Sequence, residues 1–393
     1  MTAPKKVTLN AVAVIERDIV DPTAIESGTL YVGLENIESG GRFVGVRPVD
    51  AGELASSKFA FTPQHLLYGK LRPYLAKIAR PDFEGICSTD ILPVLPGPDL
   101  DRGYLAWLLL TPEMVAFASS RATGANLPRL SPNALAELKI PLPPLPEQRR
   151  IAEMLDKTDA LRTKRRAALT QLDTLAQSIF LDMFGDAGEN TKQWPIRRIS
   201  EYVAEFQGGK SLESEIGENV VSRNYVLKIS AVTGMTFLAS ECKPVPDSYE
   251  PPIDHFVRRG DLLFSRANTT ELVGAVAYVE SAPNNLLLPD KLWRFVWRQP
   301  TTVEPLFIWA LFQTPTLRQE IERRATGTSG SMKNISQEKV FGIPTILPPI
   351  SIQREFASRL AAVEKLRVAY RASHAELNVL FSALQHRAFR GEL

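Results

Sequence analysis

The sequence predicts an α+β chain in which two similar, mixed β/α globular domains are separated by two long antiparallel helices that form a coiled coil. Three observations carry this prediction. The chain is an ordered, pseudo-twofold internal repeat; its 393 residues suffice for two or three domains; and a coiled-coil period follows a double proline in each half. We place the domains at residues 1–145 and 186–349, and the long helices at residues 146–185 and 350–393.

The composition limits the class of protein. With 44% apolar and 23% charged residues, long disordered segments are not expected. The 46 basic and 44 acidic residues leave a net charge of +2, so any site for a polyanion must be a local patch. The apolar stretch from Tyr104 to Leu110 is too short for a membrane span, which needs about 20 residues. Because Cys87 and Cys242 stand alone and no signal peptide is visible, we expect a cytoplasmic protein without membrane contact.

The internal repeat rests on short matches that keep their order. Leu66 to Lys70 resembles Leu262 to Arg266, and Ala122-Thr123-Gly124 recurs as Ala325-Thr326-Gly327. The separation between matched residues drifts at first and then stays constant to the end of the chain. Ordered matches with a drifting separation indicate a duplication with small loop insertions.

The part of each half before the double proline has the pattern of a mixed domain. Short apolar or alternating runs there are bounded by Gly, Pro, Asp or Ser, which is typical of strands. These runs are Leu30 to Leu34, Ile91 to Leu95, Val226 to Ile229 and Val273 to Val279. A helix is expected to close each domain, over Tyr104 to Ala118 and over Leu306 to Arg323.

The part after each double proline has a helical period. Seam residues recur about every 3.5 positions, as in coiled coils. The first seam comprises Ile151, Leu155, Thr158, Arg162, Arg165, Leu169, Leu172, Ala176, Ile179 and Met183; the second comprises Phe356, Leu360, Val363, Arg367, Tyr370, His374, Leu377, Phe381, Leu384 and Ala388. The polar seam residues either fix the register or mark a point where the helices diverge or meet a third partner. In the simplest arrangement the two helices pair antiparallel, with the domains at opposite ends.

Motifs for catalysis are not found. Gly209-Lys210-Ser211 imitates the end of a phosphate-binding loop, but the required first glycine would fall at Ala204. The four histidines are scattered, and no metal-ligand spacing is present. We therefore predict no catalytic residue, no cofactor-binding residue and no metal ligand in this chain.

Two related modules on a rigid spacer suit the recognition of two separated features on one long ligand. Double-stranded DNA is such a ligand, because equivalent grooves recur every ~34–36 Å. The segment from Pro143 to Arg149, its echo from Pro348 to Arg354 and the ending from Ala388 to Leu393 are similar to the specificity (S) subunit of type I restriction-modification enzymes. The resemblance covers almost the whole chain.

The resemblance implies a division of labour. Two target recognition domains would each read one half of a bipartite, asymmetric DNA site. The helices would set the spacing and dock two methyltransferase subunits, which would supply the S-adenosylmethionine chemistry of DNA methylation. Restriction or motor subunits would complete the complex. The chain itself would be non-catalytic.

The candidate DNA-binding residues lie in two kinds of segment. Four of them follow equivalent strands of the two domains: Lys70, Arg72, Arg266 and Asn268. Three lie after the repeated Ala-Thr-Gly, where glycine lets the backbone approach a phosphate: Arg129, Lys333 and Asn334. The alternative for each is a solvated surface charge or a turn residue.

Two other functions remain open from the sequence. One is a fused or stand-alone DNA methyltransferase or nuclease whose motif is not recognised. The other is a coiled-coil scaffold that holds other proteins together and does not bind DNA.

Overall fold

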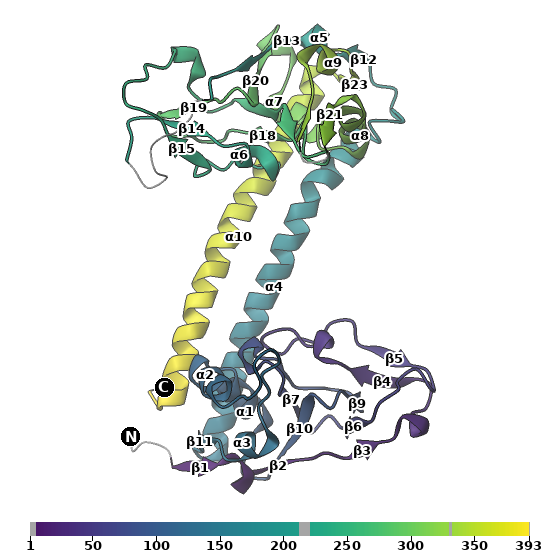
Figure 1. Cartoon of the computed structure of the whole chain (residues 1–393), viewed down its shortest axis with the longest axis vertical. Coiled ribbons are helices and arrows are strands. Elements are labelled where there is room, and N and C mark those ends of the chain that lie inside the picture. The colour runs from purple at the N-terminus through teal and green to yellow at the C-terminus, as the bar shows by residue number, and fades with distance from the viewer. Residues whose placement is uncertain (1–4, 212–220, 330–331, 393) are drawn as a thin grey trace. The chain divides into compact units, whose positions relative to one another are not determined.

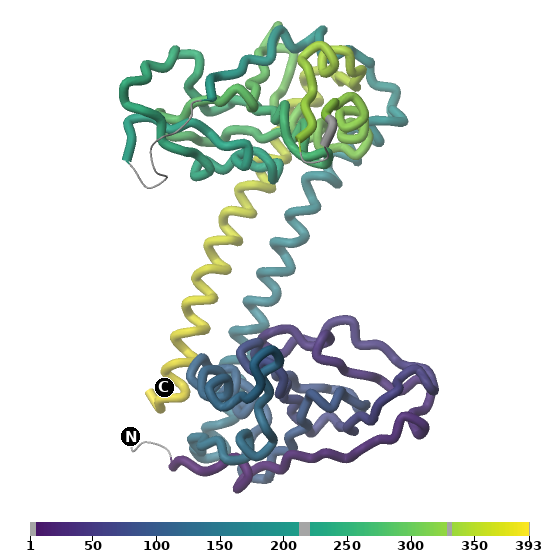
Figure 2. The backbone as a smooth tube through the Cα atoms, viewed as in Figure 1, coloured from purple at the N-terminus to yellow at the C-terminus, as the bar shows by residue number. Residues whose placement is uncertain are grey.

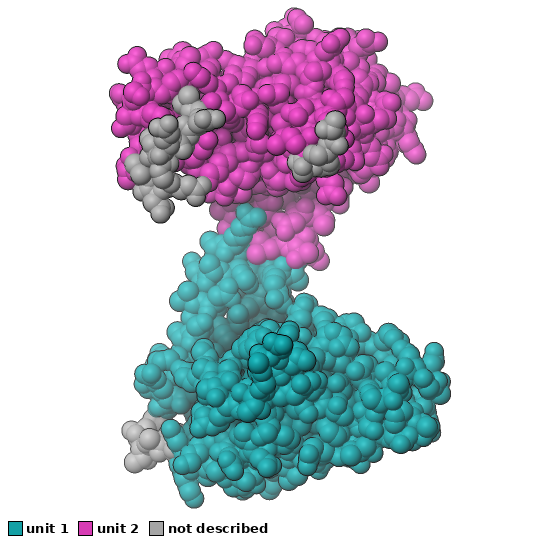
Figure 3. Space-filling view, in the orientation of Figure 1, with its two compact units in different colours: residues 1–168, 370–393 teal, residues 169–369 magenta. Residues whose placement is uncertain are grey.

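The computed structural model describes residues 5–211, 221–329 and 332–392. The chain forms two compact units (Figure 3): residues 1–168 with 370–393, called the first unit here, and residues 169–369, called the second unit. Each unit combines one sheet-rich domain with parts of both long helices (Figures 1 and 2). The boundary between the two compact units therefore falls in the middle of both long helices.

The first unit is built on two sheets and a short ribbon. The four-stranded sheet has the order β2 (Ala13–Ile15), β10 (Ile91–Pro96), β7 (Leu66–Gly69), β8 (Ile78–Ala79) and is antiparallel throughout. The five-stranded sheet has the order β3 (Ile19–Val20), β6 (Lys58–Phe61), β9 (Gly85–Cys87), β4 (Thr29–Val32), β5 (Arg47–Val49), with one parallel pair, β4 with β9. The ribbon joins β1 (Lys6–Thr8) to β11 (Lys139–Pro141).

Short helices complete the first unit. The α-helices are α1 (Arg102–Leu109), α2 (Pro112–Ser120) and α3 (Pro132–Ala136). The 3-10 helices are η1 (Leu9–Ala11), η2 (Pro22–Ala24), η3 (Leu34–Asn36) and η4 (Pro73–Leu75). The core includes α1, which is buried almost throughout.

The second unit repeats the four-stranded sheet and the ribbon of the first. Its antiparallel four-stranded sheet has the order β13 (Val203–Gly208), β20 (Leu292–Trp297), β16 (Leu262–Ser265), β18 (Val276–Tyr278). Two three-stranded sheets have the orders β15 (Cys242–Pro244), β14 (Tyr225–Leu227), β19 (Leu286–Leu287) and β17 (Ala267–Asn268), β22 (Met332–Asn334), β21 (Thr326–Ser329). A ribbon joins β12 (Ile196–Arg198) to β23 (Pro344–Ile346). The helices are α5 (Ile199–Tyr202), α6 (Ser230–Thr233), α7 (Pro305–Leu311), α8 (Pro315–Arg324), α9 (Gln337–Phe341), η5 (Ile253–His255) and η6 (Pro300–Thr302).

Matching register confirms the internal repeat. In the first unit β7 pairs with β10 so that Gly69 lies opposite Ile91, and in the second unit β16 pairs with β20 so that Ser265 lies opposite Leu292. The chain then leaves the sheet in the same way, because Leu130 N–H donates to Lys70 O and Ile335 N–H donates to Arg266 O. The prediction of two similar mixed domains is thus confirmed.

The helix that was expected to close each domain is two helices in the structure. Thr111-Pro112 separates α1 from α2, and Thr314-Pro315 separates α7 from α8. Proline has no N–H to continue the preceding helix but suits the first position of a new one. Thr111 also caps α2, since its hydroxyl accepts a hydrogen bond from Met114 N–H at 3.3 Å.

Each long helix is fixed to its own domain by a buried glutamine. The helices are α4 (Leu145–Phe184) and α10 (Ile350–Arg390). In α4, the Gln148 side chain donates to Pro143 O at 2.8 Å and to Asp99 O, and accepts from Asp101 N–H. In α10, Gln353 donates to Pro348 O and accepts from Glu304 N–H. The carbonyl of the first proline of each pair is thereby bound to its own helix.

Within each unit the parts of the long helices are antiparallel. In the first unit Arg162 contacts Phe381 and Arg165 contacts Tyr370, so higher numbers on α4 meet lower numbers on α10. In the second unit the Phe180 ring lies 5.7 Å from that of Phe356, and Asp173 lies 3.6 Å from Arg367. All the predicted seam positions are buried or half-buried, which confirms the period.

The arginines of the two seams contact the facing helix. The Arg162 guanidinium lies 4.3 Å from the Phe381 ring centre and donates to Asn378 Oδ1 at 2.8 Å. The Arg165 guanidinium lies 4.1 Å from the Tyr370 ring centre. These contacts favour the interpretation that polar residues fix the register of the helices.

Candidate nucleic-acid interface

In the first unit three predicted residues gather at one end of the inner strands of the four-stranded sheet. Lys70 follows the last residue of β7, and its N–H donates to Asp90 O at 2.9 Å. Arg72 N–H donates to Pro128 O at 2.7 Å, and Leu71 bridges to Arg129. The backbone therefore brings Lys70, Arg72 and Arg129 together, although Arg129 is distant in sequence.

A carboxylate lies at the centre of this group. Arg129 donates from Nε to Asp90 Oδ1 at 3.1 Å and from Nη2 to Asp90 Oδ2 at 3.4 Å. Lys70 Nζ lies 3.9 Å from the same carboxylate. Hydrogen bonding and charge attraction to Asp90 raise the pKa of Arg129, so its guanidinium stays protonated.

The backbone at Arg72 is strained. Its φ of 50° lies in the left-handed region, which is uncommon for residues other than glycine. Arg72 is exposed, and it directly precedes η4. Strain of this kind is concentrated at functional sites, so Arg72 stays a candidate for DNA contact.

In the second unit the corresponding residues lie on a small sheet. In the pairing of β17 with β22, Ala267 lies opposite Asn334, and Asn268 lies opposite Lys333. Lys333 Nζ donates to Gly327 O at 2.9 Å, and Asn268 Nδ2 donates to Thr233 Oγ1 at 3.4 Å. The structure thus brings Asn268, Lys333 and Asn334 to one place, next to Arg266 at the end of β16.

Arg266 is held by an aspartate as well. Its Nε donates to Asp290 O at 2.9 Å, and its Nη2 donates to Asp290 Oδ2 at 3.3 Å. The Ser211 hydroxyl also donates to the Asp290 carboxylate. The guanidinium lies 5.8 Å from the ring centre of Trp293, so a cation–π contact supports the same orientation.

The glycines of the repeated Ala-Thr-Gly have a structural role of their own. Gly124 and Gly327 have φ values of 108° and 153°, and a Cβ on Gly327 would lie 2.4 Å from Met332 O. These glycines are required by the turn itself. Gly330, a further glycine of this segment, lies outside the described residues.

Asp90 and Asp290 were not among the predicted site residues. Each stands one or two residues before the central strand of its four-stranded sheet, β10 or β20. That shared position in the two halves was the signal that could have identified them.

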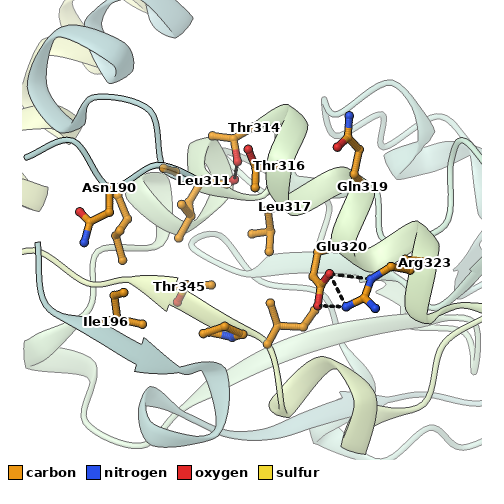
Figure 4. A pocket seen from close by; sticks show the side chains of 15 residues that line it. Asn190, Ile196, Leu311, Thr314, Thr316, Leu317, Gln319, Glu320, Arg323 and Thr345 are labelled. Atoms are coloured by element: carbon orange, nitrogen blue, oxygen red, sulfur yellow. Dashed lines mark hydrogen bonds and ion pairs between the residues drawn. The ribbon is translucent and has the colours of Figure 1, made fainter. Parts of the chain in front are cut away.

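A cavity of the second unit has none of these residues in its lining. It has a volume of about 520 Å³ and is lined by side chains that include Asn190, Ile196, Leu311 and Thr316 (Figure 4). The Glu320 carboxylate in its lining accepts hydrogen bonds from Arg323 and Arg324. A second cavity of about 400 Å³, in the first unit, lies between the segment around Arg42 and the long helices.

Neither a metal site nor a membrane-spanning helix is found in the part of the chain that the structure describes. Among residues 5–211, 221–329 and 332–392, no three His, Cys, Asp or Glu side chains gather closely enough to hold a metal ion. The helices over the same ranges include none with the length and apolar character needed to cross a membrane.

Sequence comparison identifies relatives. The family described as type I restriction modification DNA specificity domain matches residues 72–171. The type I restriction enzyme EcoDI specificity subunit of Escherichia coli is 32% identical over 171 residues, which cover 42% of this chain and 38% of that protein. The EcoKI specificity subunit of Escherichia coli strain K12 is 28% identical over 290 residues, which cover 70% of this chain and 62% of that protein. The matches therefore span less than two thirds of either relative.

Solved structures share the fold along the whole chain. A chain from work on complex assembly and conformational transition of the type I R-M system has a TM-score of 0.61 at 21% identity, covering 100% of this chain and 98% of that one. The S subunit of a type I restriction-modification system from M. genitalium has a TM-score of 0.59 at 14% identity, covering 98% of this chain and 96% of that one. At these identities the likeness concerns the fold.

Proposed function

Because this chain belongs to the family of type I restriction-modification specificity subunits, we propose that it recognises DNA by sequence and that each domain reads one half of a bipartite, asymmetric site. The observation that carries the proposal is the duplicated basic site. Lys70 and Arg72 in the first unit and Arg266 in the second follow equivalent strands. Arg129 and Lys333 lie on the segments that pair with the residues after those strands. Lys and Arg supply phosphate affinity, and planar Arg can also read base edges.

We propose further that the long helices set the spacing and dock two methyltransferase subunits. Apolar side chains point outward from both helices, and Val379 is 72% exposed. The others are Leu161, Leu175, Leu181, Leu366, Val368 and Leu380. Exposed apolar residues on a helix surface support contact with another protein.

The remaining assignments follow from the family. The chain is non-catalytic, and S-adenosylmethionine binds to the methyltransferase partners. Restriction or motor subunits join the complex, which acts in the cytoplasm. These statements rest on the relatives and are proposals for this chain.

Selection from a random DNA library tests sequence recognition. The full chain is incubated with duplexes that carry two randomised segments, at a salt concentration that suppresses non-specific binding. The expected result is an enriched motif in two parts with a fixed gap. No enrichment would support a protein scaffold, and turnover of DNA by the purified chain with magnesium and S-adenosylmethionine would support an enzyme.

A deletion tests the role of the helices in spacing. Removing one heptad from both helices preserves the seam and shortens each helix by about 10 Å, or roughly three base pairs. The gap of the enriched motif should shrink by that amount. An unchanged gap would contradict the proposed role of the helices.

Mapping of methylated adenines tests the proposal in cells. Cells that contain the chain and its methyltransferase partner should methylate one bipartite motif, and cells that lack only this chain should not. Persistence of the methylated motif without the chain would contradict the proposed role.

A further inference from the structure

The two units contain the same arginine–aspartate pair, built from different positions of the repeat. The register of the sheets makes Lys70 equivalent to Arg266, and Arg129 equivalent to Asn334. The arginine therefore comes from the segment before Leu130 in the first unit and from the end of β16 in the second. The pair is not a simple copy made by the duplication.

The aspartates also come from neighbouring rather than identical positions. Asp90 directly precedes β10, whereas Asp290 is separated from β20 by Lys291. Both nevertheless lie just before the equivalent inner strand of the four-stranded sheet. An ion pair that is built from four non-equivalent positions at one structural place points to a shared role.

Stability does not explain this shared pair. The side chains of Arg129 and Asp90 are 46% and 26% exposed, and those of Arg266 and Asp290 are 32% and 41% exposed. Partly exposed ion pairs contribute little to folding, because solvent screens the attraction and two side chains lose freedom. The geometry of the guanidinium groups is more informative.

Both arginines use the same edge of the guanidinium. Nε and Nη2 of Arg129 donate to Asp90, and Nε and Nη2 of Arg266 donate to Asp290. Among the described residues, Nη1 of each arginine has no hydrogen-bond partner. Each aspartate thus fixes the plane of a guanidinium by binding its Nε and one N–H group of Nη2. Within the described ranges, the second N–H group of Nη2 and the two N–H groups of Nη1 remain free to donate.

We propose that Arg129 with Asp90, and Arg266 with Asp290, are two preorganised readers of guanine, one for each half of the DNA site. Guanine offers two acceptors, O6 and N7, on its major-groove edge, and they match two parallel N–H donors of arginine. This inference rests on the proposed function and narrows it: each half-site contains a G·C pair that the arginine contacts.

A phosphate contact explains the pairs less well. A phosphate does not require a fixed guanidinium plane, and a carboxylate beside the arginine repels a phosphate. For guanine recognition the carboxylate is an advantage, because it holds the donors in one orientation before binding.

Library selection on variants of the full chain tests the inference. Arg129→Lys and Arg266→Lys keep the charge but lose the planar pair of donors, and Asp90→Asn and Asp290→Asn keep the shape but loosen the arginine. Each Arg→Lys variant should lose preference for guanine at one position of one half-site by about 5- to 150-fold, the range of a bidentate base contact. The other half-site and the salt dependence should stay unchanged.

Glu53→Gln is the matched control, because it breaks another ion pair of the first unit, with Arg47, away from the proposed site. The control should leave all base preferences intact, and thermal unfolding should show that every variant is folded. A half-site without a required G·C pair, or equal weakening for all sequences, would overturn the inference and leave the proposed function standing. Failure of the parent chain to enrich any sequence would overturn both.

Discussion

The two candidate sites share a backbone frame but differ in how side chains fill it. In the first unit Asp90 is approached by Lys70 and Arg129, next to the strained Arg72. In the second unit Asp290 is approached by Arg266, and β17, β22 and β21 form a sheet where the first unit has isolated bridges at Leu71 and Thr123. The duplication has preserved the place of the site, while the residues that fill it have changed. Different side chains on one frame are what an asymmetric DNA site would need.

Exchange of one domain is the largest change that would test this comparison. Replacing residues 1–140 with the corresponding domain of a relative should replace one half of the enriched DNA motif and leave the other half unchanged. Library selection with the full chimeric chain provides the measurement. A change in both halves would show that the units do not read independently.

Truncation of an aromatic ring should distinguish the two units in stability. Phe184 is fully buried against Phe307 and Phe356, so Phe184→Ala should cost about 3–5 kcal/mol through lost burial and a cavity. Its repeat partner Phe389 is half-buried beside Tyr104, and Phe389→Ala should cost about 1–2 kcal/mol. Urea unfolding followed by tryptophan fluorescence measures both.

The control for this pair is Leu181→Ala, since Leu181 is exposed on the same helix as Phe184. It should leave the free energy of unfolding nearly unchanged. Equal losses for Phe184→Ala and Phe389→Ala would contradict the difference in burial between the two ends.

A smaller difference is expected at the starts of α1 and α7. The Asp101 carboxylate accepts from Tyr104 N–H at 2.8 Å and caps α1, so Asp101→Ala should cost about 0.5–2 kcal/mol. Glu304 stands at the same place before α7 but makes no capping bond of that geometry. Glu304→Ala should therefore cost less than Asp101→Ala in the same unfolding experiment, and the reverse order would contradict the assignment of the cap.

The smallest expected effect is a pH-dependent change in unfolding temperature. Burial raises the pKa of the Glu304 carboxyl above its ordinary value of 4.5, so the native state holds its proton more tightly than the unfolded state does. Stability from the protonated form is complete below pH 4.5 and is lost as the pH rises through the raised pKa. Glu304→Gln should thus unfold at a slightly higher temperature than the parent at neutral pH, with no advantage at acidic pH.

Glu53→Gln should have the opposite effect on the melting temperature at neutral pH. Hydrogen bonding to Arg47 lowers the pKa of Glu53, so its favourable contribution is present above pH 4.5 and is lost on acidification. A gain in melting temperature for Glu53→Gln at neutral pH would contradict this reasoning.

The sequence predicted the features that repeat with a regular period. The seam from Ile151 to Met183 follows from side-chain spacing alone, and the two domains follow from ordered self-similarity. The break at Thr111-Pro112 could also have been predicted, because proline cannot continue a helix. The apolar character of the residues around it favoured one helix.

The arginine–aspartate pairs could not be predicted in the same way. Asp90 and Arg129 are distant in sequence and meet only because β7 and β10 bring their loops together. Alignment of the halves pairs Arg129 with Asn334, which hides the equivalence with Arg266. Tertiary contacts between loops decide such pairs, and a period along one segment carries no information about them.

The long helices have a consequence for synthesis on the ribosome. The core of the second unit takes Phe356 and Leu360 from the start of α10, so it is complete without the last turns of that helix. The core of the first unit includes Phe381 and Ala388 and must wait for the last turns of α10, although its domain emerges first. Until those turns arrive, the surface around Trp107 lacks its cover, and nascent chains that stall early would offer it to chaperones or to each other.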